Sequence, residues 1–316
     1  MNSADPNALL SVLVATCDRP RRLERMLASL ESEWPHLSEV VVVDNGCLDE
    51  TAELLARLAR ERPGLVAVRY EPRGKSAALN FGMRFVRGRR VAFIDDDVVV
   101  RPGWARAYVD AFRASAHPGF QGRVLPPRDV REDPEQLRRW RLFGTLPLID
   151  LGEEPCERRA LTGANMALRR EVLERVDGFD PRLGPGAAGL SEDTDLSQRV
   201  RALFGPFRYV PAAAVEHEHD EARLNERYFE EYNRRLGRSR LVQKQNSLFG
   251  SILPNLATAA LMTWATRLRP PGRAHYRQRG KLYLYSEMLR CRARRGAGCP
   301  GAGAAGGERR LQRTTT

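Results

Sequence analysis

The sequence predicts an α/β fold with a mostly parallel central sheet flanked by helices, followed by a helical C-terminal appendage. Three observations support this prediction. Apolar runs alternate with helical patterns over the first hundred residues, hydrophobic residues make up 42% of the 316 residues, and the excess of basic residues is confined to the last third of the chain. The first two features are typical of a folded α/β domain, and the third marks off a segment of different composition.

Four short apolar runs, rich in β-branched residues, predict strands that are buried on both faces. They are residues 10–15, 39–43, 65–69 and 90–94. Between them, apolar residues recur at helical spacing, as in Leu23, Met26, Leu27 and Leu30; Leu54, Leu55 and Leu58; and Leu79, Met83 and Val86. Because strand–helix–strand units connect by right-handed crossovers, this alternation predicts a parallel sheet.

The middle of the chain adds further elements. Strands are predicted at residues 120–125, 161–168 and 208–215, with a short helix around residues 137–143. Ser191 is expected to cap a helix whose apolar face consists of Leu196, Val200, Leu203 and Phe204. From residue 224 onward the pattern is helical.

Charge divides the chain into three predicted segments. Residues 1–220 form a near-neutral domain, residues 221–295 a basic helical region, and residues 296–316 a Gly/Ala/Arg/Thr-rich tail that is predicted to be disordered. Residues 221–316 hold 20 basic and 6 acidic residues, which accounts for the whole net charge of +12. The longest uncharged stretch, residues 245–266, is interpreted as a packed or surface-lying helix because Pro254 and several polar residues interrupt it.

The basic region allows two interpretations. Its arginines face water on exposed helices, or they attract an anionic partner, which would be an acidic substrate or an anionic membrane touched peripherally at its inner face. No base-reading motif is present, so no nucleic-acid partner is predicted. Five cysteines without a C-x-x-C pair argue against a zinc ribbon or disulfide scaffold. Together with an N-terminus that lacks a secretory signal pattern, they predict a cytoplasmic location.

Acidic residues follow three of the predicted strands. Asp18 comes after the first strand, Asp44 ends the second, and Asp95, Asp96 and Asp97 follow the fourth. Because ligands bind beyond the carboxyl ends of parallel strands, these groups are expected to converge at one edge. Alternation puts Asp95 and Asp97 on the same side, where one can bind a cation and the other a ribose or bridging group. No G-x-G-x-x-G follows the first strand, which argues against a dinucleotide cofactor.

Three other groups are candidates for the same site. His217 follows the last predicted strand, and a nitrogen ligand beside carboxylates favours Mn²⁺. Glu192 and Asp193 follow a glycine-rich loop that is able to close over substrate and deliver a general base. Lys75 precedes a helix start that suits a phosphate. Each pattern also has a structural interpretation. Asp95 to Asp97 would form a solvated turn, and His217 would belong to a surface histidine pair. Glu192 and Asp193 would stabilise a helix dipole, and Lys75 would lie in a basic turn.

In combination, the motifs resemble those of the family 2 inverting glycosyltransferases, which have a Rossmann-like GT-A fold. The resemblance covers about residues 9–220, and the motifs occur in family-like order. They are T-C-D-R-P (16–20), V-V-V-V-D-N-G-C-L-D-E-T (40–51), R-G-K-S-A-A-L-N-F-G (73–82), F-I-D-D-D (93–97), T-G-A-N-M-A-L-R-R-E-V-L (162–173), G-F-D (178–180), S-E-D-T-D-L (191–196) and H-E-H (217–219).

The resemblance implies a nucleotide-sugar donor, with UDP-sugar favoured on family frequency, a Mn²⁺ or Mg²⁺ ion, and inversion at the anomeric carbon. It implies that Asp193 is the general base and that Glu192 holds the acceptor hydroxyl or orients the base. The implied metal ligands are Asp95, Asp97 and His217, and the implied donor side consists of Thr16, Asp18, Arg19, Asp44, Lys75, Asp95 and Asp96.

Two departures from the family pattern concern the donor side, where Cys17 replaces a common aromatic residue and Cys47 a common serine. The C-terminal third lacks the Q-x-x-R-W motif of processive relatives, which favours addition of a single sugar. The acceptor stays open between a small molecule, a lipid-linked saccharide, a glycan and a peptide. Two other functions are also open: a nucleotidyltransferase that makes sugar nucleotides, and a non-catalytic binding subunit with the same fold.

Overall fold

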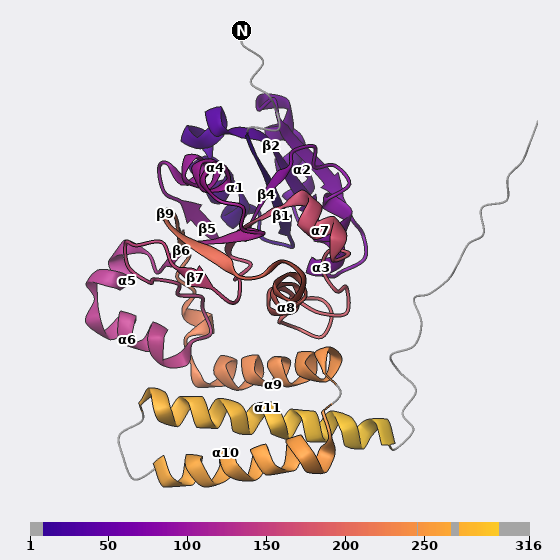
Figure 1. Ribbon diagram of the computed structural model, residues 1–316, viewed down its shortest axis with the longest axis vertical. Coiled ribbons are helices and arrows are strands. Elements are labelled where there is room, and N and C mark those ends of the chain that lie inside the picture. The colour runs from indigo at the N-terminus through magenta and orange to yellow at the C-terminus, as the bar shows by residue number, and fades with distance from the viewer. Residues whose placement is uncertain (1–8, 245, 267–271, 297–316) are drawn as a thin grey trace, which may run out of the picture.

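The computed structural model describes residues 9–244, 246–266 and 272–296. A central sheet has helices on both faces, and three further helices are stacked at one end of the molecule (Figure 1). The strands are β1 (Leu10–Thr16), β2 (Leu37–Asp44), β3 (Leu65–Arg69), β4 (Arg90–Ile94), β5 (Val98–Val100), β6 (Gly119–Leu125), β7 (Glu157–Arg158), β8 (Asn165–Arg169) and β9 (Phe207–His217).

The helices are α1 (Pro20–Ser29), α2 (Thr51–Glu61), α3 (Lys75–Gly82), α4 (Trp104–Ala114), α5 (Arg128–Glu132), α6 (Pro134–Phe143), α7 (Arg170–Arg175), α8 (Glu192–Phe204), α9 (Glu226–Gln243), α10 (Leu253–Thr266) and α11 (Arg273–Gly296). Short helical turns complete the set: η2 (Glu31–His36), η3 (Glu221–Arg223) and the π-helical η4 (Leu248–Ile252).

The strand order is β3-β2-β1-β4-β8-β6-β9-β5, with β7 beside β9. The first four strands are parallel, as the alternating pattern predicts. Beyond β4 the sheet is mixed, because β8 runs antiparallel to both β4 and β6. Ile94 at the end of β4 therefore pairs with Asn165 at the start of β8. As a consequence, the segment before β8 lies beside the carboxyl end of β4.

Strands β1, β2 and β4 are buried on both faces, which explains why they are continuous apolar runs. The edge strand β3 departs from the prediction, because only Leu65 is buried in it. Successive residues of a strand point to opposite faces. Val12 and Val14 belong to a core cluster under α1, α2 and α4, whereas Leu13 belongs to a second cluster under α3, α7 and α8. Both clusters hold the strands in one register, so the strand ends form a fixed edge.

The structure corrects one predicted strand boundary and one predicted helix face. The strand predicted at residues 161–168 begins only at Asn165, because the backbone N–H groups before it bond to side chains instead of a neighbouring strand. Leu161 N–H donates to Ser197, Thr162 N–H to Gln121 and Gly163 N–H to Asp193. The apolar face predicted for α8 is also too long: Leu196 and Val200 are buried, but Leu203 and Phe204 are 64% and 40% exposed.

Asn165 is a buried polar junction between β8, β6, β9 and α4. Its Oδ1 accepts hydrogen bonds from Trp104 at 2.9 Å and from Tyr108 at 2.8 Å. Its Nδ2 donates to the carbonyls of Arg123 and Ala213 at 2.9 and 2.8 Å. Every polar atom of the amide thus has a partner inside the core.

Replacing Asn165 with leucine is therefore expected to lower the free energy of unfolding by roughly 2 to 4 kcal/mol, since each buried donor or acceptor left unpaired costs about 1 to 3 kcal/mol. Urea denaturation followed by circular dichroism measures the change. Asn80→Leu is a comparison for an amide that bonds to only one neighbouring segment, around Phe179. A loss at Asn165 no larger than at Asn80 would contradict the junction role.

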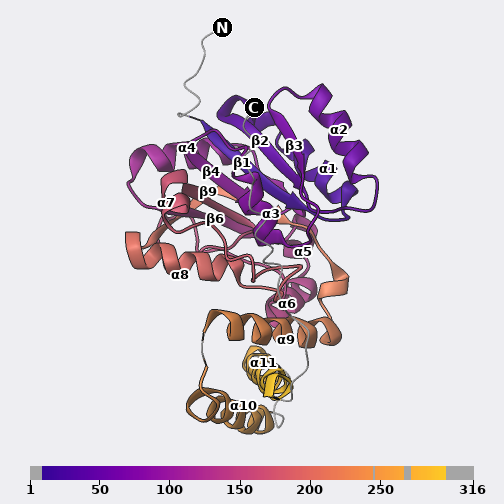
Figure 2. The ribbon, with the colours of Figure 1, turned by 90° about the vertical axis from the view of Figure 1, so that its right-hand side faces the viewer.

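The C-terminal helices are stacked in the order α9, α11, α10 away from the sheet, and Figure 2 shows α11 end-on between the other two. Two glycines permit close contact between α9 and α11. A Cβ on Gly237 would lie 2.5 Å from the carbonyl oxygen of Leu284, and a Cβ on Gly280 would lie 2.6 Å from Asn233. The helical pattern predicted from residue 224 is present in the described residues. The domain boundary at residue 220 stays a prediction. The tail was predicted for residues 296–316, but Gly296 still belongs to α11, and residues 297–316 lie outside the described residues.

Candidate active site

The carboxyl ends of β1, β2 and β4 meet at one edge, as predicted. Thr16 pairs with Asp44 in the register of β1 and β2. Thr16 Oγ1 also donates a hydrogen bond of 2.7 Å to Asp96 Oδ2. Burial and the neighbouring charge of Asp97 raise the pKa of Asp96 to about 6, against the opposing effect of Arg19. Asp96 therefore links strand ends inside the protein, while its two neighbours lie on the other side of the chain.

Asp95, Asp97 and His217 form a cluster in which one ligand atom from each lies within 4.8 Å of the others. Asp97 and His217 are almost completely buried, and His217 Nε2 lies 3.3 Å from Asp97 Oδ1. His217 Nδ1 is 3.0 Å from the carbonyl oxygen of Glu218. Since a carbonyl only accepts, Nδ1 carries the hydrogen in this contact, and Nε2 of the neutral ring is left as the ligand nitrogen.

These residues fit a divalent cation. Arginines contact Asp97 Oδ2, but Asp97 Oδ1 is buried and has no hydrogen-bond partner among the described residues. An unpaired buried oxygen is costly, and a bound cation would compensate it. Two carboxylates and one imidazole nitrogen are ligands suited to Mn²⁺, and less selectively to Mg²⁺. The ring of Trp140 lies edge-on to His217, with 6.3 Å between centroids, and helps to fix the imidazole.

Three arginines border the same cluster. Arg19 Nη1 lies 3.2 Å from Asp96 and 3.3 Å from Asp97. Arg22 and Arg223 approach Asp97 Oδ2 at 3.9 and 3.6 Å. Arg19 was predicted for the donor side, but the sequence reasoning missed Arg22 and Arg223. Arg22 is one helical turn after Arg19, which is a usable signal, whereas Arg223 lies in the turn η3 and carries none.

Asp18 and Asp44 lie on the other side of this edge, and each is already held by a backbone amide and an arginine. Asp18 accepts from Leu48 N–H at 2.8 Å and pairs with Arg73 at 2.8 Å. Asp44 accepts from Cys47 N–H at 2.8 Å and pairs with Arg69 at 2.6 Å. Both carboxylates are thus fixed in place.

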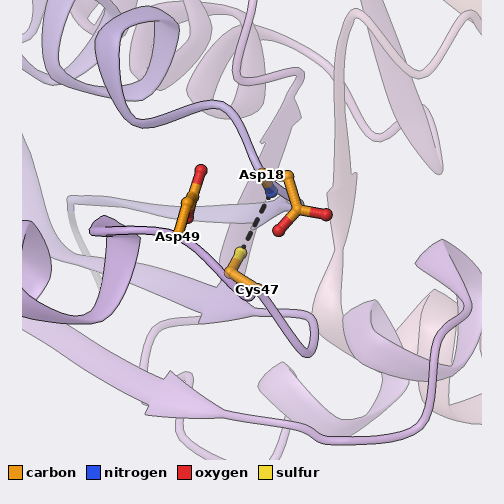
Figure 3. Close-up of side chains that lie close together, drawn as sticks. All are labelled: Asp18, Cys47 and Asp49. Atoms are coloured by element: carbon orange, nitrogen blue, oxygen red, sulfur yellow. Dashed lines mark hydrogen bonds between the residues drawn. The ribbon is translucent and has the colours of Figure 1, made fainter.

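Asp18, Cys47 and Asp49 form a second group close enough to surround an ion (Figure 3). Burial raises the pKa of the Cys47 thiol to about 12, so the sulfur stays protonated and accepts a hydrogen bond from Asp18 N–H. Metals bind the thiolate form. Asp49 accepts hydrogen bonds from the backbone and side chain of Thr51 at the start of α2. We therefore interpret this group as structural.

Lys75 connects the cation cluster to the second pair of acids. Its Nζ lies 2.5 Å from Asp95 Oδ1 and 3.5 Å from Glu192 Oε1. Burial acts to raise the pKa of Asp95, but the Lys75 charge outweighs it and the pKa is lowered. For Glu192, burial prevails over Lys75 and the pKa is raised. Lys75, predicted near a diphosphate, thus lies between Asp95 and Glu192.

Asp193 lies at the start of α8 and is held by two backbone amides. Its Oδ2 accepts from Gly163 N–H at 3.0 Å and its Oδ1 from Thr194 N–H at 2.6 Å. A pocket beside it combines charged and apolar walls. The residues that line it are Lys75, Asp95, Glu192, Asp193 and Gly163 on the charged side, with Leu79, Phe93, Ile94, Met166 and Phe179 on the apolar side.

The glycine-rich loop before α8 is attached at both ends, which the sequence reasoning did not foresee. Lys75 N–H donates to the carbonyl of Pro185, and Leu190 N–H donates to Ser239 Oγ on α9. The predicted capping role of Ser191 is wrong, because its side chain makes no cap hydrogen bond and its φ of 75° is left-handed. Asp193 supplies the acceptor for a free N–H at this helix start instead.

A parallel sheet half, an acidic D-x-D cluster after β4, a histidine at the end of the last strand and paired acids at the start of α8 together define the GT-A class of glycosyltransferase folds. The family model described as "Glycosyl transferase family 2" matches residues 11–177, more than half of the chain. The chain belongs to this family.

Curated proteins that match this chain include relatives at 26 to 27% identity. The uncharacterized glycosyltransferase alr2836 of Nostoc sp. is 26% identical over 177 residues, which are 54% of each chain. Our chain spans about half or less of the length of the curated relatives it matches.

Two solved structures share the fold. The mannosyltransferase PcManGT from Pyrobaculum calidifontis, in complex with GDP-Man and Mn²⁺, superposes with a TM-score of 0.51 at 19% identity, covering 94% of this chain and 79% of its own. GalNAc-T7 with UDP, GalNAc and Mn²⁺ gives 0.52 at 15% identity, covering 72% and 48%.

Proposed function

We propose that the chain is a metal-dependent inverting glycosyltransferase that moves a single sugar from a nucleotide-sugar donor to an acceptor hydroxyl. The observation that carries this proposal is the connection between two groups of acids. Asp95 belongs to the buried cation cluster with Asp97 and His217. Lys75 contacts both Asp95 and Glu192, and Glu192 is next to Asp193. A donor held at the first group would place its sugar beside the second.

Asp95, Asp97 and His217 would hold the cation, and a bound Mn²⁺ or Mg²⁺ would neutralise charge that grows on the departing nucleoside diphosphate. Mn²⁺ and nucleotides in the two solved structures with this fold support that assignment. Arg19, Arg22 and Arg223 border the cluster and add fixed positive charge for the same diphosphate. Thr16, Asp18 and Asp44 form the nucleoside side of the edge.

Asp193 would act as the general base. It takes the proton of the acceptor hydroxyl while the acceptor oxygen forms a bond to the anomeric carbon and the bond from that carbon to the diphosphate oxygen breaks. Attack opposite the leaving group inverts the anomeric centre. The amides of Gly163 and Thr194 hold the carboxylate in position for this transfer. Glu192 and Lys75 line the pocket on the acceptor side.

The proposed activity is tested with pooled sugar nucleotides. Release of free nucleoside diphosphate that depends on added acceptor supports the transferase, and formation of sugar nucleotide from a nucleoside triphosphate would identify a nucleotidyltransferase instead. If neither product forms, the remaining alternative is a non-catalytic binding subunit. We further propose a cytoplasmic location, which the free thiols of Cys17, Cys47, Cys156 and Cys291 support.

UDP is the nucleotide we expect the donor side to bind best. A thermal-shift screen of UDP, GDP and dTDP, each with and without Mn²⁺, tests this expectation. A ligand at 100 times its Kd adds about 2.7 kcal/mol to stability, and we expect that gain for UDP only when Mn²⁺ is present. A larger shift with GDP, or equal shifts with and without the ion, would contradict the nucleotide or the metal assignment respectively.

A further inference from the structure

The outermost helix of the molecule exposes an apolar surface. The segment formed by η4 and α10, Leu248–Thr266, is long and apolar enough to cross a membrane by length and composition, yet only 17% of its most apolar window is buried. Its large exposed side chains are Phe249 (77% exposed), Leu261 (62%), Met262 (42%) and Trp264 (66%). Among the described residues, nothing covers these side chains. Surface this apolar on one element usually marks a contact site.

The opposite side of the segment packs on the protein. Ile252, Ala259 and Thr263 are buried, and Ile252 joins a small core with Tyr285 and Met288 of α11. The segment is therefore attached along its length to α11, and it lies across the end of the molecule (Figure 1). It is a helix with one face against protein and one face outward.

Basic side chains accompany this apolar face. On α11, Arg273, Arg277 and Lys281 recur every four residues, are exposed, and have no acidic partner among the described residues. Elsewhere on the same helix, Arg279 pairs with Glu226. Exposed cations on α11, the helix packed against the apolar segment, match the chemistry of a bilayer surface, with anionic headgroups beside hydrocarbon.

We propose that the Leu248–Thr266 segment is an in-plane anchor that docks this protein on an anionic membrane surface, with Leu261, Met262 and Trp264 entering the interface and the α11 cations contacting the headgroups. The packing on α11 argues against a membrane-crossing arrangement. A crossing α10 would draw Arg273, Arg277 and Lys281 into hydrocarbon, where charged side chains are costly. This proposal is independent of the proposed catalytic activity.

Co-sedimentation of the full chain with vesicles tests the anchor. We expect binding to mixed phosphatidylglycerol–phosphatidylcholine vesicles, weaker binding to pure phosphatidylcholine, and release at high salt. The double variant Leu261→Glu/Trp264→Glu should bind roughly tenfold more weakly or worse. Leu203→Glu, an equally exposed leucine on α8, is the matched control and should bind like the wild type. Circular dichroism checks that each variant is folded.

Two further measurements separate the contribution of the α11 cations from that of the apolar side chains. Arg277→Glu/Lys281→Glu should weaken binding to the anionic vesicles and flatten its salt dependence, while leaving binding to neutral vesicles unchanged. The fluorescence of Trp264 should shift to shorter wavelength on vesicles, and Trp264→Phe should remove that shift.

Any of four results would overturn the proposal. The first is that the wild type binds neither vesicle, and the second is that the Leu261→Glu/Trp264→Glu variant binds as well as the wild type. The third is that the wild type stays on vesicles after both high salt and alkaline carbonate. The fourth is that the wild type is a dimer that binds no vesicle, whereas the double variant is a monomer. The third result would indicate a crossing helix, and the fourth a second copy of the chain on this face.

Discussion

Replacing Asp193 with asparagine is expected to lower kcat by roughly 10² to 10⁴-fold, which corresponds to about 3 to 5 kcal/mol of transition-state stabilisation. Asparagine keeps an oxygen that accepts the hydrogen bond from Gly163 N–H, but the amide cannot take a proton from the acceptor. The Kd for the donor should stay within about twofold, because Asp193 is not one of the three residues that would hold the cation. Steady-state kinetics and donor titration on one preparation measure both quantities.

Glu192→Gln is the matched comparison, since Glu192 is adjacent but buried against Lys75. We expect this variant mainly to raise the acceptor KM. If Asp193 served only to stabilise the start of α8, its substitution would cost about 0.3 to 1 kcal/mol of stability with kcat intact. A near wild-type kcat for Asp193→Asn would therefore end the general-base assignment.

Asp97→Asn should nearly abolish turnover, by roughly 10³-fold or more, because several kcal/mol of charge stabilisation on the leaving group depend on the cation. The variant keeps the shape of the buried side chain between Arg19, Arg22 and Arg223. Mn²⁺ titration by calorimetry gives a readout independent of activity, and we expect binding to be lost.

Asp49→Asn provides the control for this prediction, since Asp49 belongs to the second acidic group, near Cys47. It should retain Mn²⁺ binding and dependence on the ion. Full activity of the wild type in excess EDTA, or unchanged Mn²⁺ affinity of Asp97→Asn, would reject the cluster as the cation site.

The parts of the fold that follow from local patterns were predictable from the sequence. Continuous apolar runs identified β1 to β4, of which β1, β2 and β4 are buried on both faces. The acids at the ends of these three strands converge because parallel strands share an edge. The direction of β8 was not predictable in this way. Its antiparallel pairing with β4 depends on contacts between distant residues, such as those of Asn165.

In the candidate site, too, local patterns predicted some features and distant contacts determine the others. Asp95, Asp97 and His217 cluster as predicted, because the two acids follow β4 and the histidine is the last residue of β9 in the same sheet. Arg223 and the bond between Leu190 and Ser239 carry no local signal, since their partners are distant in sequence and only the folded chain brings them together. The roles assigned to all these residues stay predictions until they are tested.

The hydrogen bond from Leu190 to α9 also determines how far the candidate active site lies from the outermost helix, α10. Leu190 N–H bonds to Ser239, and Gln243 bonds to the carbonyl of Ser191, so the loop that leads to Glu192 and Asp193 is attached to the innermost of three stacked helices. Packed helices have axes 8–10 Å apart and an overall diameter near 10 Å, so a stack of three is about 25 to 30 Å thick. If a bilayer covers α10, a short headgroup cannot reach Asp193. An acceptor anchored in that bilayer must then present its hydroxyl at the end of a chain long enough to span this stack.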